Sequence, residues 1–118
     1  MGAKIKVIIK RPDEKIGHVT NISPTLENLQ RTVDGYVEDV ILMRGSGDKE
    51  GHNVIMIVNE EGKIKGLDKN IIMGTWAAFD VIRGTLIVAQ AGPDGDLEDL
   101  DLLSFDAWKD VLKHWGNI

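Results

Sequence analysis

Five consecutive apolar residues, Val54-Ile55-Met56-Ile57-Val58, stand in the middle of this chain. Four of the five are β-branched, and Asn53 and Asn59 bound the run on either side. A short apolar run of this composition is typical of a strand that is buried on both faces. Such a strand needs a neighbour on each side, so the rest of the chain must supply a sheet around it.

Residues 4–10 predict the first of these further strands. Ile5, Val7 and Ile9 alternate with Lys4, Lys6 and Lys10, and Ile8 is the exception. This period of two predicts a half-buried strand whose outer, basic face carries Lys4, Lys6 and Lys10 and protects a sheet edge. Further strands are expected over residues 16–22, 36–43, 53–59, 63–65 and 84–91, while residues 66–70 have the composition of a loop.

Two segments predict helices, at 24–34 and 104–115. Ser23 suits an N-cap, Pro24 the first helical position, and Gly35 the stop of the first helix. The second segment has apolar residues at helical spacing, which predicts that it covers its own sheet. These residues are Phe105, Trp108, Leu112 and Trp115.

At 118 residues, with no linker, repeat or low-complexity tract, the chain reads as a single domain over 1–118. The expected class is α+β, with a mixed or antiparallel sheet of five to six strands carrying the two helices. The lack of cysteine excludes disulfides, thiolate zinc sites and thiol nucleophiles. No apolar run approaches the ~20 residues of a membrane span and no signal peptide is evident, so we expect a cytoplasmic protein without membrane contacts.

The formal net charge of −5 conceals two unlike ends. Residues 1–15 hold five basic side chains against two acids, whereas residues 94–110 hold seven acids against Lys109. Mild overall acidity argues against a long nucleic acid as a partner. It does not argue against a small phosphorylated ligand held by a local basic cluster.

The known motifs of catalysis and metal binding do not occur in the sequence. The loop Gly45–Gly51 is one residue too long for a dinucleotide fingerprint, the three histidines are scattered, and a calcium loop started at Asp94 fails at its sixth and twelfth positions. We therefore predict no catalytic residue, metal site or cofactor, and a non-enzymatic role is favoured. Carboxylates that meet only through the fold leave a hydrolase open.

Several segments together resemble a family of small uncharacterised proteins, a domain of unknown function, found in phages and in Firmicute mobile elements. The most specific segment is Val58-Asn59-Glu60-Glu61-Gly62-Lys63-Ile64-Lys65-Gly66-Leu67 with Asn70 after it. Where similar sequences carry proline and arginine, this chain has Asp68 and Ile71. The other segments are Lys10-Arg11-Pro12, Leu26–Gln30, Gly35–Glu38, Asp80-Val81-Ile82 and Gly84-Thr85-Leu86.

The resemblance implies a phage-type binding protein, such as an anti-defence protein that sequesters a phosphorylated nucleotide signal and forms a homo-oligomer. Polar residues at strand ends and turns become the candidate ligand-binding site: Arg11, Tyr36, Glu38, Asn59, Glu60, Lys63, Lys65 and Asn70. Each could instead have a structural task, such as holding a turn or pairing across the sheet. The alternatives are an inhibitor that binds a host enzyme through the acidic 94–101 segment, and a nucleotide-cleaving hydrolase.

Overall fold

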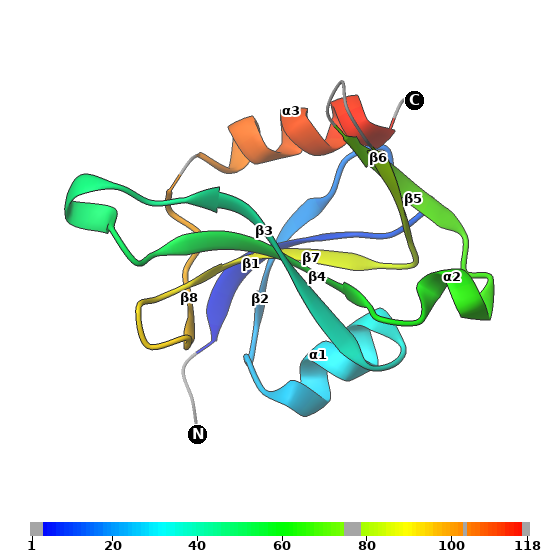
Figure 1. The fold of residues 1–118 in the computed structure, drawn as a ribbon, viewed down its shortest axis with the longest axis horizontal. Helices are drawn as coiled ribbons and strands as arrows, with labels where there is room; N and C mark the ends of the chain where they lie inside the picture. Colours follow the sequence, from blue (N-terminus) through cyan, green and yellow to red (C-terminus); the bar gives the residue numbers. More distant parts are fainter. Residues whose placement is uncertain (1–3, 75–78, 103, 117–118) are drawn as a thin grey trace.

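A computed structural model describes residues 4–74, 79–102 and 104–116. It confirms an α+β domain built on an antiparallel sheet of six strands, with a separate two-stranded hairpin (Figure 1). The strand order is β2-β1-β7-β4-β3, and β8 pairs with β7. The strands of this sheet are β1 (Ile5–Lys10), β2 (His18–Ile22), β3 (Val37–Arg44), β4 (Asn53–Asn59), β7 (Leu86–Ala91) and β8 (Leu97–Glu98).

The apolar run 54–58 lies in β4, between β7 and β3, and is buried along its whole length. It is therefore an interior strand, as the sequence predicts. Its antiparallel neighbour β7 is buried from Leu86 to Gln90 for the same reason, since both of its faces are covered.

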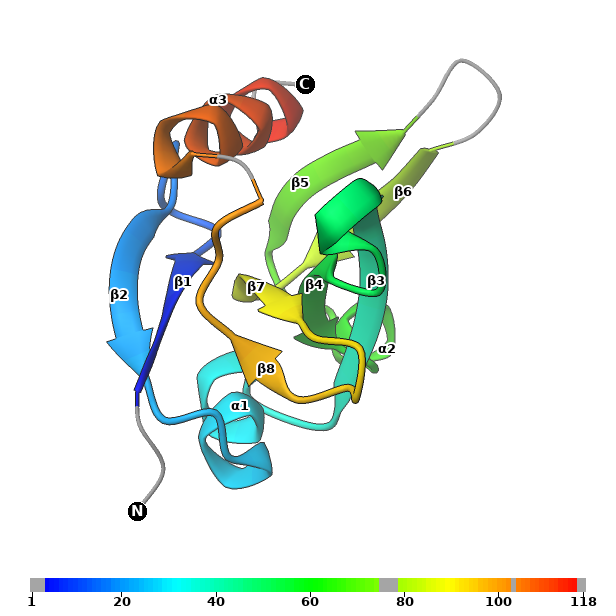
Figure 2. The ribbon, with the colours of Figure 1, turned by 90° about the vertical axis from the view of Figure 1, so that its left-hand side faces the viewer.

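One face of the sheet packs against α1 (Leu26–Val33). Leu29 and Val33 of the helix join the odd-numbered residues of β1 and β4, such as Val7 and Ile57, in a buried cluster. Figure 2 shows α1 on this side, below the sheet.

The opposite face is covered by α3 (Phe105–Gly116) and by the hairpin of β5 (Lys69–Gly74) and β6 (Phe79–Arg83) (Figure 2). Trp108 and Leu112 of α3 are buried in one cluster with Met56 and Ile71. The last helix thus covers its own sheet, as its apolar spacing predicts. Trp76 lies outside the described residues.

The first helix begins two residues later and ends one residue earlier than the predicted range 24–34. Its N-cap is Thr25, whose Oγ1 accepts the N–H of Asn28 at 3.2 Å, so neither Ser23 nor Pro24 is helical. At the other end Asp34, not Gly35, takes the left-handed conformation, with φ of 62°. Aspartate tolerates this region better than most residues, because its side chain is short and polar.

Two further expectations are wrong. The predicted strand 63–65 is a short helix, α2 (Gly62–Lys65), and the expected loop 66–70 runs into β5 at Lys69. A glycine in the left-handed conformation, Gly66 with φ of 69°, ends α2. A short 3-10 helix, η1 (Gly47–Lys49), lies in the loop between β3 and β4.

The expected basic edge strand is also wrong, because β1 lies inside the sheet between β2 and β7. Its Lys10 is only 1% exposed and lies under the covering layer of α3 and β5. The sequence pattern could not distinguish a lysine that faces solvent from one that the last helix and hairpin cover.

Candidate functional site

A cleft of about 270 Å³ opens where the ends of β3 and β4 face α2 and β6. Val58 and Ile82, both nearly buried, form its apolar floor, and Ile64 stands at its rim with 85% of its surface exposed. The complete lining is Glu38, Val58, Asn59, Glu60, Gly62, Lys63, Ile64, Val81, Ile82 and Arg83.

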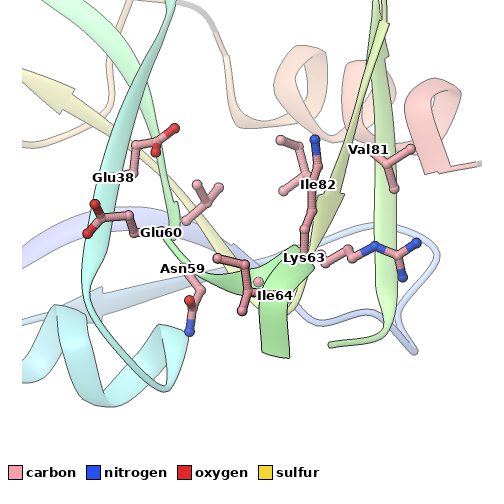
Figure 3. Close-up of a pocket in the computed structure, with 10 residues that line it drawn as sticks. Glu38, Asn59, Glu60, Lys63, Ile64, Val81 and Ile82 are labelled. Carbon is pink, nitrogen blue, oxygen red and sulfur yellow. The ribbon is translucent and has the colours of Figure 1, made fainter. Parts of the chain in front are cut away.

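Opposite charges line the two walls of the cleft. Figure 3 shows Glu38 and Glu60 on the side formed by β3 and β4, with Lys63 on the side of α2. Arg83 of β6 also lines the cleft, and its Nη1 donates to the carbonyl of Leu67, outside the lining, at 3.2 Å. The cleft therefore offers carboxylate acceptors on one wall and the ammonium group of Lys63 on the other.

Asn59 holds the local backbone that shapes this cleft. Its Nδ2 donates to the carbonyls of Val33 and Asp34, each at 3.0 Å, and its Oδ1 accepts the N–H of Glu61 at 2.8 Å. The side chain thus ties the end of α1 to the turn between β4 and α2. All three bonds are to the backbone, so Asn59 positions the site.

Gly62 allows α2 to approach β6 closely. A Cβ at this position would lie 3.0 Å from the carbonyl oxygen of Arg83 and 3.4 Å from its side chain. A larger residue would push α2 away from β6. Gly62 directly precedes the segment 63–65 that the sequence predicts as a strand, so this close approach does not follow from the sequence.

The fold brings together four of the eight predicted site residues and separates the others. Glu38, Asn59, Glu60 and Lys63 line the cleft. Lys65 reaches the carbonyl of Asp34 instead, with its Nζ 3.4 Å away.

Tyr36 and Arg11 lie outside the cleft lining. Tyr36 is 64% exposed, and its carbonyl accepts the N–H of Glu60 at 2.8 Å. Arg11 forms an ion pair with Glu14 at 3.5 Å. The cleft residues that the site prediction missed come mainly from α2 and β6: Gly62, Ile64, Val81, Ile82, Arg83 and, from β4, Val58.

Asn70 has a structural task at a second, buried position. Its Oδ1 accepts from Lys10 Nζ at 2.6 Å, and its Nδ2 donates to the carbonyls of Lys10 and Gly84, each at 2.8 Å. Burial lowers the pKa of Lys10, although the charges of Glu14 and Asp13 oppose this. The pair therefore joins β1 to β5 and to the turn between β6 and β7, beneath α3 and away from the cleft.

The acidic segment is attached to the sheet through Gln90, which is fully buried. Its Nε2 donates to Glu98 at 2.5 Å and to Asp101 at 2.9 Å, and its Oε1 accepts two backbone N–H groups of the same segment. His52 contacts Glu98 at 2.7 Å. These acids therefore have internal partners, which leads us to place the candidate site in the cleft and not on this segment.

The pKa of Asp101 lies below its ordinary value, chiefly because Gln90 donates to it and also because Lys49 and His52 are near. The unfolded chain then binds more protons than the folded one as the pH falls past about 3.9. We expect Asp101→Asn to reduce the free energy of unfolding at pH 7 by less than about 1 kcal/mol, since the carboxylate is half exposed. The difference should narrow as the pH falls from 7 to 3, as measured by urea unfolding.

Asp110→Asn on the exposed side of α3 controls for the change in net charge. An equal gap between Asp101→Asn and wild type at both pH values would contradict the assigned cause.

Within the described ranges no group of three or more acidic or histidine side chains is placed to hold a metal ion. No helix of the described chain is both long and apolar enough to cross a membrane.

The molecule is thus an α+β domain whose antiparallel sheet carries a cleft of mixed charge at one end. Residues 5–112 match the family described as a domain of unknown function, DUF3846, and the chain belongs to that family. A search of curated proteins and a search of solved structures each found no match.

Proposed function

We propose that this protein binds a small phosphorylated ligand, of about the size of a nucleotide, in the cleft and releases it unchanged. The observation that carries the proposal is the pairing of Lys63, on the side of α2, with a wall that holds Glu38 and Glu60. Arg83 also lines the cleft. Ammonium and guanidinium groups supply the charge and donors that phosphate oxygens accept.

The other features of the cleft suit the rest of such a ligand. The two carboxylates can accept from the N–H and O–H donors of a base or a sugar, and Val58, Val81 and Ile82 offer an apolar surface to a ring. At about 270 Å³ the cleft lies just below the range of small-molecule sites, roughly 300 Å³ and above. This size favours one nucleotide unit over a longer chain.

In this proposal the biological role is sequestration. A phage or mobile element would use the protein in the cytoplasm of its bacterial host to hold a nucleotide signal of a defence system. The support is the resemblance described above together with the chemistry of the cleft.

Calorimetry against cyclic nucleotides and ADP-ribose derivatives tests the binding. We expect micromolar affinity for at least one of them, and a loss of about tenfold or more in Lys63→Glu, because a charge-assisted contact becomes a repulsion. Lys63 is exposed, so the variant should fold. Lys113→Glu, on an exposed position of α3, is the matched control. Folded protein that binds none of the probes at micromolar concentration would falsify the proposal.

Heat release separates a binder from a hydrolase. The complex is incubated for hours, denatured by heat, and the released ligand is analysed by chromatography. A sequestering protein returns its ligand intact, whereas a hydrolase returns product.

A further inference from the structure

The outer edge of β3 is the feature that the proposed function leaves unexplained. β3 is the last strand in the order of the sheet and pairs with β4 along its inner side (Figure 2). It is eight residues long, from Val37 to Arg44. An edge strand of this length presents a row of N–H and C=O groups that another strand can pair with.

The hydrogen bonds at the two ends of β3 show which of its residues present these groups. The N–H of Glu60 donates to Tyr36 at 2.8 Å, and the N–H of Gly45 donates to His52 at 2.7 Å. In an antiparallel ladder, hydrogen-bonded and non-hydrogen-bonded pairs alternate. Tyr36 and Glu60 form a hydrogen-bonded pair, so Asp39 and Ile41 fall in non-hydrogen-bonded pairs with β4. Their N–H and C=O groups therefore point outward, away from β4.

A bulge between Ile41 and Met43 resets this alternation. Beyond the bulge, Gly45 and His52 form a hydrogen-bonded pair, so Arg44 falls in a non-hydrogen-bonded pair with Asn53. The N–H and C=O groups of Arg44 therefore also point outward. Without the bulge, Asp39 and Arg44 would be out of phase. With it, both present their backbone groups to the free edge.

The exposed side chains of β3 are complementary to the same side chains of a second, antiparallel copy of the strand. Asp39 and Arg44 are exposed, and Ile41 between them is 46% exposed. All three lie on the sheet face that carries α1, because their neighbours Val40 and Met43 pack on the other face. In a second copy that runs in the opposite direction, the acid Asp39 can lie opposite the base Arg44, with the apolar Ile41 between the two charged residues.

We propose that two copies of this chain pair antiparallel through β3, about a twofold axis, with Asp39 opposite Arg44 of the second copy. Both residues present outward backbone groups and lie on the same face, so this register satisfies the hydrogen bonds and the charges together. Two ion pairs then flank the apolar centre, and the sheet continues through both copies. The same register places Gly45 of the second copy beside Glu38, at the cleft.

Charge reversal tests the register. We expect analytical ultracentrifugation of the wild-type chain, from micromolar to millimolar concentration, to show a monomer–dimer equilibrium. Asp39→Arg and Arg44→Asp should each weaken the dimer about tenfold or more, because each variant places like charges opposite one another twice. The double variant Asp39→Arg/Arg44→Asp should restore the wild-type dissociation constant.

Asp110→Arg on α3 changes the net charge as Asp39→Arg does and should leave the dimer unchanged. Circular dichroism checks that each variant is folded. A chain that stays monomeric at millimolar concentration overturns the proposal and indicates that the charges on β3 protect the edge. A dimer that neither single reversal weakens, or that the double variant fails to restore, also overturns it. None of these outcomes depends on ligand binding in the cleft.

Discussion

Replacing Trp108 by alanine is expected to lower the free energy of unfolding by about 4 kcal/mol, the usual cost of removing a buried aromatic ring. Trp108 is 4% exposed and belongs to the cluster that α3 forms with Met56, Ile71 and Leu112. Its ring is a large part of what attaches the last helix to the sheet. Urea unfolding followed by far-ultraviolet circular dichroism measures the change, and a loss below about 1.5 kcal/mol would contradict it.

Trp108→Phe should behave differently. The indole Nε1 of Trp108 is buried and finds no hydrogen-bond acceptor among the described residues. A buried donor without an acceptor costs about 1–3 kcal/mol, and phenylalanine removes it while keeping most of the apolar area. We therefore expect Trp108→Phe to lie within about 1 kcal/mol of wild type. If its loss equals that of Trp108→Ala, the indole nitrogen has a role that this structure does not give it.

Replacing Asn70 by alanine is the second change with a large expected effect, a loss of about 3 kcal/mol. The substitution removes the amide oxygen that accepts from the buried ammonium of Lys10, and it removes the amide donor to the carbonyls of Lys10 and Gly84. Unpaired buried groups of this kind cost more than the lost hydrogen bonds themselves, and most of all when one group is charged. Chemical unfolding at pH 7 measures the loss.

A double-mutant cycle with Lys10→Met separates the charge from the packing. Without the buried ammonium, Asn70→Ala should cost about 1–2 kcal/mol less than it does in wild type. Burial holds the pKa of Lys10 in the folded protein below its unfolded value. The wild type should therefore gain stability as the pH rises toward about 10.4, and Lys10→Met should lack this gain. Additive losses and parallel pH profiles would argue against a buried charge at this position.

The strands with the strongest apolar patterns were predictable, and the elements with weak patterns were not. β4 and β7 follow from runs that only a buried strand explains. The segment Lys63-Ile64-Lys65 alternates like a strand but forms a helix, with Ile64 exposed. Its local pattern is too short to decide between strand and helix, and in the helix Gly62 lies close against Arg83.

Half of the candidate site was also predictable, because turns at strand ends carry polar residues. Glu38, Asn59, Glu60 and Lys63 were found in this way. Arg83 and Val81 were missed as site residues, because β6 meets α2 only after the β5–β6 hairpin packs over the sheet. Asn70 was assigned to the site from its place in the chain, and only its buried contacts with Lys10 show its structural task.

The sequence by itself determined the class of this protein: a cysteine-free α+β domain with β4 inside the sheet and a last helix that covers it. Hydrophobic periodicity carries this information because burial of each strand and helix face is a local requirement. The tertiary structure alone decided that β1 is interior, that Lys10 is buried and that opposite charges meet across the cleft. These properties depend on which distant segments become neighbours, and a local pattern does not contain that information.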